Sequence, residues 1–432
     1  KQRLEEIRDG LINEFKINAD IIPADLEDEK TPDLIYDYCK GKEYFVNLLV
    51  NNAGYALPKP FHETPMEDEE KFLRVLGISV VALTKLFIKD MIREKMYYDL
   101  LIVGAGPSGL AAAIKFKKMC IENNKDYSVC VVEKGSEVGA HILSGAILQP
   151  TAMDELFNDW RDNPECPVKV NVKKESVKFM TDEKSFSIPN ILIPPVMHNK
   201  GNFIISLGSL CKWLGSEAEK LGVEIYPGFA ASDIIINNGV LKGIVTGDLG
   251  VDNQGSPGQN YQPGIEIHSK FTLFAEGCRG HLGKKLMSEF DLRKEVQHQT
   301  YGIGLKELWE VKPEKSEPGN VMHSIGWPLD QDTYGGSFLY HLDKNLVSIG
   351  FVIGLDYKNP YLSPYEEFQR FKMHPSIKPL LDEGRRVSYG AHALNEGGWQ
   401  SLPKLSFAGG SIIVGQTAAK SSCLQPQPGM ND

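Results

Sequence analysis

The chain has 432 residues, of which 42% are hydrophobic and 24% charged, and its formal net charge at pH 7 is −10. This composition is typical of a globular protein, and the length predicts about three domains. The net negative charge and the lack of an extended cluster of Lys and Arg residues argue against nucleic acid as a partner. Seven scattered cysteines, none in a CxxC pair, argue against a disulfide framework and carry no local zinc or iron–sulfur signature.

Residues 1–95 alternate between helical and strand patterns. Apolar residues recur at helical spacing over 1–20, 31–42 and 66–94. Between them, two short apolar runs predict strands at Ala19–Ala24 and Phe45–Val50. The second run ends in the sequence Asn-Asn-Ala-Gly at residues 51–54.

This segment resembles the middle of a short-chain dehydrogenase. LVNNAG at Leu49–Gly54 is that family's strand-end signature, and Asp25 matches its adenine-contacting aspartate; the alternative is a chance turn. The family's glycine-rich turn and its Tyr-x-x-x-Lys pair have no counterpart, and Ser79 stands where the family commonly has Asn. We therefore expect an incomplete Rossmann-like fragment at 1–95, joined to an unrelated enzyme.

Residues 96–133 form the most informative stretch. An apolar run, Leu100–Val103, predicts a buried strand, and Gly104, Gly106 and Gly109 follow it as GxGxxG at the start of a helix pattern. A second apolar strand ends at Glu133. This order predicts a diphosphate at the helix N-terminus and a ribose on Glu133, whereas the alternative is an ordinary glycine-rich turn. The motif alone does not separate FAD from NAD.

Residues 134–290 continue an α/β pattern. The loop after Glu133 contains His141 and Ser144 as its uncharged hydrogen-bonding side chains, although a capping or surface histidine is an equal alternative for His141. Helices are predicted at 151–160 and Ser206–Leu221, and a strand at Val223–Tyr226 extends the parallel sheet.

Residues 247–264 are rich in turn-forming residues and predict a long loop or hairpin. The strand Phe271–Ala275 then closes on Glu276–Gly280, an Ala-x-Gly-x-x-Gly turn. Such a second strand-end turn lets the backbone pass close to a flavin nucleotide, and a plain surface turn is the alternative.

Beyond residue 291, apolar residues alternate along the chain, notably at Phe338–Leu342 and Val347–Ile353. This period of two predicts antiparallel strands. Here the chain contains QTYGIGLKELWEV, TYGGSFLYHL and GAHALNEGGWQSLPKL. Together with GAHILSGA and FAEGCRG, these stretches resemble electron transfer flavoprotein–ubiquinone oxidoreductase over residues 97–411.

The resemblance implies a two-motif, doubly wound FAD-binding α/β domain with an inserted antiparallel-sheet quinone domain. On this basis the FAD domain takes residues 96–165, 206–290 and 396–415, the quinone domain takes 166–205 and 291–395, and 416–432 is a divergent tail. The predicted cofactor-binding residues are Gly104, Gly106, Pro107, Ser108, Gly109, Glu133, Lys134, Gly139, Ala140, His141, Ser144, Gly145, Ala275, Glu276 and Gly277. Gly335 and Gly336 correspond to the glycines at the ubiquinone headgroup, although without the resemblance a Gly-Gly hairpin turn is the preferred explanation.

The family's reaction is electron transfer from reduced electron transfer flavoprotein to ubiquinone, and it needs no catalytic acid, base or nucleophile. The family is peripheral to an inner membrane, bacterial or mitochondrial. Its bilayer-dipping region corresponds to Gly139–Phe157, whose apolar residues are otherwise core residues.

The family also carries a [4Fe–4S] domain whose cysteines have no counterpart here, so we expect a chain that stops short of it and binds no metal. Two alternatives remain. One is an FAD-dependent reductase or hydroxylase of a prenyl lipid, and the other is a non-catalytic hybrid of two gene fragments.

Overall fold

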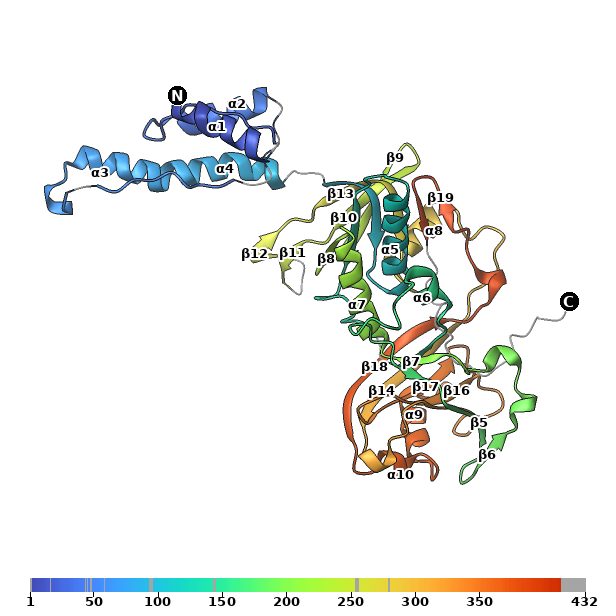
Figure 1. Cartoon of the computed structure of the whole chain (residues 1–432). Coiled ribbons are helices and arrows are strands. Elements are labelled where there is room, and N and C mark those ends of the chain that lie inside the picture. Colours follow the sequence, from blue (N-terminus) through green and yellow to red (C-terminus); the bar gives the residue numbers. More distant parts are fainter. Residues whose placement is uncertain are drawn as a thin grey trace. The chain divides into compact units, whose positions relative to one another are not determined.

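The computed structural model describes residues 2–412 except 16, 43, 45, 47, 48, 58, 93–95, 143, 144, 253–255 and 279. The chain divides into two compact units, Lys1–Lys95 and Met96–Asp432 (Figure 1). Each unit is described by itself.

The first unit is helical wherever it is described as regular structure. Its helices are α1 (Gln2–Phe15), α2 (Thr31–Gly41), α3 (Met66–Leu73) and α4 (Ser79–Ile92), with a short 3₁₀ turn η1 (Phe61–Glu63) and a π-helical segment η2 (Arg74–Ile78) that joins α3 to α4. The predicted helices are confirmed, but the strand predicted at Ala19–Ala24 is wrong, and the described residues of Phe45–Val50 form none. A parallel strand needs hydrogen-bonded neighbours on a sheet, and the described part of this unit offers none.

The second unit is built on a mixed eight-stranded sheet. Its main path is β19-β20-β13-β1-β2-β8, with β10 paired to β13 and β9 paired to β10. Strands β20, β13, β1, β2 and β8 are parallel to one another. The bounds are β1 (Met96–Val103), β2 (Val129–Glu133), β8 (Glu224–Pro227), β9 (Ala231–Asn237), β10 (Val240–Thr246), β13 (Glu266–Phe274), β19 (Ser406–Phe407) and β20 (Gly410–Ile412).

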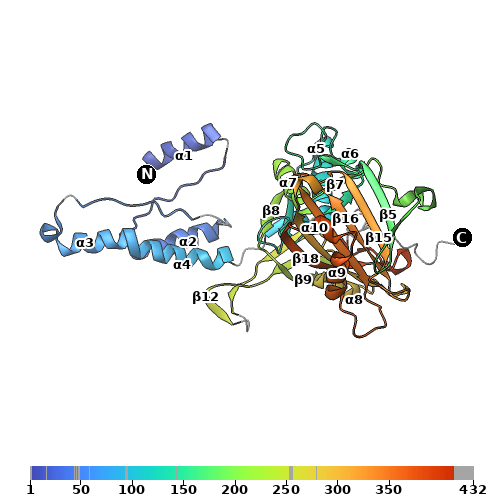
Figure 2. The same cartoon turned by 90° about the horizontal axis from the view of Figure 1, so that it is seen from below.

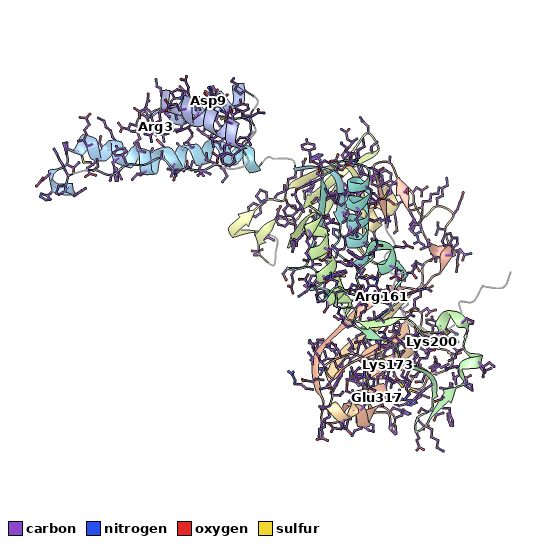
Figure 3. The ribbon with its side chains drawn as sticks, in the orientation of Figure 1. Arg3, Asp9, Arg161, Lys173, Lys200 and Glu317 are labelled. Carbon is purple, nitrogen blue, oxygen red and sulfur yellow. The ribbon has the colours of Figure 1, made fainter. Side chains whose placement is uncertain are left out.

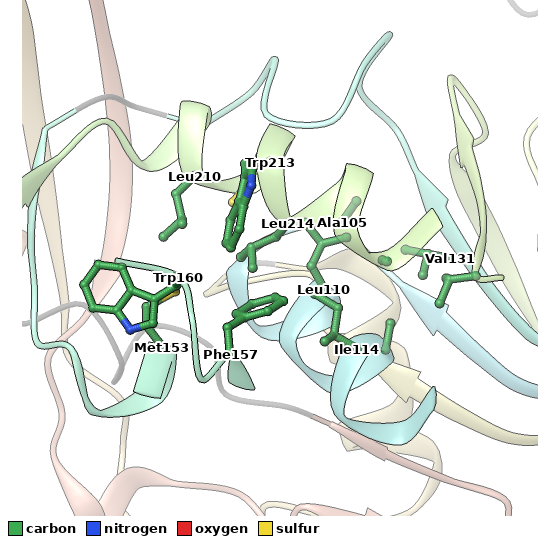
Figure 4. Close-up of a cluster of buried hydrophobic side chains, with 14 of the residues drawn as sticks. Ala105, Leu110, Ile114, Val131, Met153, Phe157, Trp160, Leu210, Trp213 and Leu214 are labelled. Carbon is green, nitrogen blue, oxygen red and sulfur yellow. The ribbon is translucent and has the colours of Figure 1, made fainter. Parts of the chain in front are cut away.

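Helices cover both faces of this sheet, which confirms the predicted doubly wound α/β fold. On one face, α5 (Pro107–Glu122), α6 (Thr151–Leu156) and α7 (Leu207–Lys220) bury a cluster that includes Leu110, Phe157 and Trp213 (Figure 4). On the other face, α8 (His281–Glu289) and the β9–β10 hairpin cover Leu101 and Val132. Helix α6 ends earlier than predicted, because the chain turns at Phe157 to place Trp160 in the same core.

The described Ile, Leu, Met and Phe residues of 139–157 are buried or half-buried, and Leu143 lies outside the described residues. Phe157 is buried between α5 and α7, and Met153 is buried beside Trp160 (Figure 4), while Ile147 is buried in the neighbouring cluster. These three side chains are therefore core residues and are not available to a bilayer. Among the described residues, no helix is both long and apolar enough to cross a membrane.

The second large element is a seven-stranded sheet, ordered β18-β14-β17-β16-β15-β5-β6. It lies below the first sheet in Figure 1 and is antiparallel except between β15 and β5. Strands β5 (Lys174–Met180) and β6 (Ser185–Ile188) come from one part of the chain. The others are β14 (Tyr301–Glu310), β15 (Asn320–Gly326), β16 (Gly335–His341), β17 (Leu346–Gly354) and β18 (Arg385–Asn395).

Smaller elements complete the unit. Helices α9 (Pro364–Met373) and α10 (Lys378–Leu381) pack on one face of the seven-stranded sheet, and Figure 2 shows this side of the molecule. A three-stranded sheet joins β3 (Ala146–Leu148), β7 (Phe203–Ile205) and β4 (Val170–Asn171), and β11 (Leu249–Val251) pairs with β12 (Pro257–Gln262) in the predicted hairpin. Short 3₁₀ turns lie at η3 (Asn190–Leu192), η4 (Pro195–Met197), η5 (Pro313–Lys315) and η6 (Trp399–Ser401). Exposed charged side chains, such as Arg161, Lys173 and Glu317, project from this unit (Figure 3).

Candidate functional site

A cavity of about 830 Å³ lies where the two sheets meet, within the volume range of small-molecule and cofactor sites. One wall is formed by the carboxyl ends of β1, β2 and β13, which is where ligands bind in open parallel sheets. The opposite wall is a face of the seven-stranded sheet. Its residues include Gly304, Lys306, Phe338, Tyr340, Val352 and His392.

The glycine-rich turn forms the first wall through close backbone contacts. Gly104 adopts φ +106°, which favours glycine, and a Cβ there would lie 2.5 Å from the Ala275 carbonyl oxygen. A Cβ on Gly109 would lie 2.1 Å from the Gly104 carbonyl oxygen. A Cβ on Gly106, by contrast, would meet nothing within 4 Å. Two glycines thus allow the tight packing, and the third leaves space open in front of the N-terminus of α5.

Glu133 is held at the end of β2 by backbone amides. Its Oε2 accepts a hydrogen bond from Ala105 N at 2.9 Å, and its Oε1 accepts one from Gly135 N at 2.7 Å. Each carboxylate oxygen retains a further lone pair, and the side chain lines the cavity. Glu133 is therefore fixed in place as an acceptor for hydroxyl donors of a ligand.

Glu276 holds a helix N-terminus rather than acting as an acceptor for a sugar hydroxyl. Its Oε2 accepts a hydrogen bond from Gly283 N at 2.7 Å, at the start of α8. A carboxylate at a helix N-terminus is stabilised by the unpaired amides there. Glu276 lines the cavity with Ala275 and Gly277, but its hydrogen bonds fix the second turn against α8.

The opposite wall carries a positive charge. Lys306 is half-buried, its Nζ donates to the Gly145 carbonyl oxygen at 2.8 Å, and burial lowers its pKa to about 8. Burial, together with the ammonium groups of Lys306 and Lys134, also lowers the pKa of His392. This end of the cavity thus repels further cations and favours an anion.

Behind Tyr340 lies a buried histidine. His323 Nε2 is 2.9 Å from the Tyr340 hydroxyl, and burial lowers the pKa of His323 to about 4. The imidazole is therefore neutral near pH 7, and it orients the Tyr340 ring, which stacks on Phe338. The aromatic part of this wall is held by packing and one hydrogen bond.

The cavity brings together most of the sequence-predicted residues. Those that line it are Gly104, Gly106, Pro107, Ser108, Glu133, Lys134, Gly139, His141, Gly145, Ala275, Glu276 and Gly277. Gly109 lies behind Gly104, and Ala140 does not line the cavity. Ser144 lies outside the described residues.

Gly335 and Gly336 begin strand β16 and do not line the cavity, and the turn precedes them. Gly336 pairs with Val352, which faces the cavity, so Gly336 shares that face of the sheet and Gly335 points to the other. A Cβ on Gly335 would lie 2.3 Å from the Val352 carbonyl oxygen, and one on Gly336 would lie 2.8 Å from that of Ser324. Strand packing therefore also requires small residues here.

Sequence reasoning missed the residues of the opposite wall, Lys306, Phe338, Tyr340, Val352 and His392. Their strands were predicted, but the order of the strands in the sheet was not, so nothing placed these side chains opposite the glycine-rich turn. One signal was available: Lys306 follows directly on the uncharged stretch YGIGL at residues 301–305. The glycines of LNEGGW marked the loop at Gly397 and Gly398, which also lines the cavity.

Three known sequence families match parts of the chain. The ubiquinone-binding domain of ETF-QO matches residues 301–394, short chain dehydrogenase matches residues 1–96, and an NAD(P)-binding Rossmann-like domain matches residues 102–156. The first match extends over β14–β18, and the third runs from the end of β1 through α5 and β2. The second confirms the predicted resemblance of residues 1–95.

The chain is 54% identical over 326 residues to the electron transfer flavoprotein–ubiquinone oxidoreductase of Pseudomonas aeruginosa, covering 75% of this chain and 59% of that one. It is 53% identical over 318 residues to the mitochondrial enzyme of that name from Mus musculus, covering 73% of this chain and 51% of that one. It thus spans between half and three fifths of the length of these relatives.

Among solved structures, a geranylgeranyl bacteriochlorophyll reductase-like protein from Thermoplasma acidophilum matches with a TM-score of 0.55 at 14% identity. The match covers 74% of this chain and 71% of that one. At this identity it supports the fold alone.

Proposed function

We propose, on the premise that residues 97–411 resemble electron transfer flavoprotein–ubiquinone oxidoreductases, that this chain is a flavoprotein:quinone oxidoreductase unit. In this proposal it binds FAD, accepts electrons from reduced electron transfer flavoprotein and passes them to ubiquinone. The relatives that carry this name are more than 50% identical to the chain over the matched residues. Because the chain spans only part of their length, the reaction is our inference for this chain.

One observation carries the proposal: a single cavity has the dinucleotide turn on one wall and the ubiquinone-binding sheet on the other. Residues of β1, β2 and the turn after β13 face residues of β14, β16 and β18 across it. The sheet residues fall within the 301–394 match. A redox ring held between these walls lies next to the sheet that the relatives use for quinone.

The residues present fit FAD. The N-terminus of α5, preceded by the open space at Gly106, suits a diphosphate because its unpaired amides and helix dipole stabilise negative charge. Glu133 suits the ribose, and the aromatic and aliphatic wall at Phe338, Tyr340 and Val352 suits the flavin ring. When bound, FAD supplies the redox chemistry, while the protein orients the ring, excludes water and sets the surrounding charge.

For ubiquinone we retain Gly335 and Gly336 as proposed headgroup residues. Gly336 is the better supported, since it shares a sheet face with the cavity-lining Val352 and Gly304. We also propose that residues 166–205 and 291–395 make up the quinone domain, since β5 and β6 share the sheet of β14–β18.

The described residues do not fit an iron–sulfur cluster, so no step is routed through one. Among them, no group of three or more His, Cys, Asp or Glu side chains is placed to hold a metal ion. Burial raises the pKa values of the Cys166 and Cys211 thiols, and of Cys130, which keeps these groups protonated rather than as thiolate ligands.

The function is tested by loading the protein with FAD, reducing the flavin anaerobically and adding a soluble short-chain ubiquinone. We expect the oxidised flavin absorbance to return with one quinone reduced per flavin. Addition of NADH or NADPH to the oxidised protein is the comparison. Rapid NAD(P)H oxidation that depends on a prenyl lipid, with no reaction toward ubiquinone, would instead support the reductase or hydroxylase alternative.

For localisation we propose peripheral attachment to an inner membrane, bacterial or mitochondrial. The described surface offers an apolar patch, Phe179, Phe186, Ile191 and Leu192, on and after the β5–β6 hairpin, which we call the hairpin patch. Ile191 is 91% exposed, Leu192 70% and Phe186 54%. Exposed apolar side chains gathered in this way are typical of a surface that enters a lipid interface. We propose the hairpin patch as the membrane-contacting surface in place of residues 139–157, whose described apolar side chains are largely buried.

The hairpin patch predicts a specific flotation result. Ile191→Glu with Leu192→Glu should lower co-flotation with phosphatidylcholine–cardiolipin vesicles at least tenfold, because burying each side chain contributes roughly 1.5–3 kcal/mol. The matched control is Ile121→Glu on α5, where the side chain is 58% exposed but outside the patch. Equal flotation of the patch variant and the control would remove the proposal.

A further inference from the structure

Lys306 stands out among the cavity residues because its charge lacks a counter-ion. Its ammonium donates to one neutral carbonyl, that of Gly145, at 2.8 Å. No carboxylate of the described residues pairs with it, and burial is the cause of its lowered pKa. A buried ammonium with two remaining donors and no opposite charge is costly. Such a group marks a place where negative charge arrives from a ligand.

The neighbouring strands leave room for this side chain to extend into the cavity. The neighbours of Lys306 across the sheet are Gly390 on β18 and Gly350 on β17, neither of which has a side chain to cover it. The space above Gly350 is taken by the Phe338 ring, which a Cβ at that position would meet at 2.1 Å. The ammonium lies 5.2 Å from the centroid of this ring. Lys306 is thus directed along an aromatic surface into the cavity.

The diphosphate of a dinucleotide has its own proposed site, away from Lys306. It belongs at the N-terminus of α5, beside Gly106, on the wall formed by the parallel sheet. Lys306 belongs to the opposite wall, with Phe338, Tyr340 and Val352. A flat aromatic ring fits this wall, so the charge that Lys306 meets is charge on the ring.

We propose that Lys306 faces the isoalloxazine ring of bound FAD and stabilises the negative charge that the ring gains on reduction. This inference rests on the proposed function. Lys306 then raises the reduction potential of the bound flavin relative to a neutral wall, since an adjacent cation favours the more negative state of the ring.

The test compares the dissociation constants of oxidised and chemically reduced FAD, measured anaerobically by calorimetry. In Lys306→Met, reduced FAD should lose at least tenfold more affinity than oxidised FAD. For a two-electron couple this equals a fall in potential of about 30 mV. Lys306→Arg keeps the charge and should restore the ratio to within about threefold. Lys242→Met, at an exposed position on the largely buried strand β10, is the charge-matched control and should leave the ratio unchanged.

The outcomes distinguish the proposed role of Lys306 from the proposal that the chain binds FAD. Equal loss of affinity for both forms, or no loss for either, overturns the role of Lys306 while leaving the FAD proposal intact. Failure of the unsubstituted protein to bind either form instead overturns the proposed function itself. If Lys306→Met does not fold, Lys306→Gln repeats the comparison with a polar, uncharged side chain that can still donate to the Gly145 carbonyl.

Discussion

Replacing Gly106 with valine is expected to abolish FAD binding while leaving the fold intact. A Cβ at this position meets nothing within 4 Å, because it projects into the cavity in front of α5. Gly106 has φ −79° and ψ −179°, and Pro107 follows it, so an extended β-branched residue is readily accommodated there. The added side chain occupies the space through which a diphosphate approaches the backbone amides. The dissociation constant for FAD should rise at least 100-fold, about 2.7 kcal/mol.

Gly109 provides the contrast for this prediction. A Cβ there would lie 2.1 Å from the Gly104 carbonyl oxygen and 3.3 Å from Ala275 Cβ, so Gly109→Val should disrupt the packing of α5 on β1 and lower the thermal midpoint. Gly106→Val should keep a midpoint close to that of the unsubstituted chain, since a poorer N-cap costs about 1 kcal/mol or less here. Unchanged FAD affinity in Gly106→Val would show that no diphosphate lies at this turn.

We expect a substitution that breaks the buried ion pair of Glu307 with Lys372 to cause a large loss in the free energy of unfolding. Glu307 is 3% exposed, and both its carboxylate oxygens lie 2.9 Å from Lys372 Nζ on α9. It also accepts from Arg386 at 3.1 Å and from the Trp309 indole at 2.7 Å. Glu307→Gln leaves a buried ammonium without its counter-charge, which costs about 3–5 kcal/mol. Denaturant unfolding measures this loss.

A double-mutant cycle separates the pair from its surroundings. The cycle compares Glu307→Leu and Lys372→Met alone with the two combined. The double variant removes both buried charges and should lose less stability than the sum of the two single losses. Arg386, whose side chain is partly exposed, can then be hydrated. Additive losses in the double variant would contradict a mutually compensating pair.

The sequence predicted the elements whose signals are local. The β1–α5–β2 unit followed from an apolar run, three glycines and an acid, all within 34 residues from Leu100 to Glu133. Helix α7 and strands β16 and β17 followed from apolar periodicity. In each case the signal lies within the element's own residues.

The predictions that failed concern features that depend on contacts between segments far apart in the sequence. The strand predicted at Ala19–Ala24 had the right composition, but the described residues of its unit include no strand with which it could pair. Ile147 and Phe157 had the apolar character of either a core or a membrane surface, and only the packing of α5 and α7 decided between them. Lys306 entered the cavity because β14 lies between β17 and β18, an order that periodicity does not encode.

The central claim is that the cavity between the two sheets binds a flavin dinucleotide through its diphosphate and ribose. The most direct test is equilibrium titration of the purified chain with FAD and with FMN, which lacks the adenosine half. We predict one FAD per chain and an affinity for FMN at least 100-fold weaker, because FMN forgoes the contacts at Glu133 and part of those at α5. Equal affinities for FAD and FMN, or no binding of either, would contradict this account, and the latter would favour a non-catalytic hybrid.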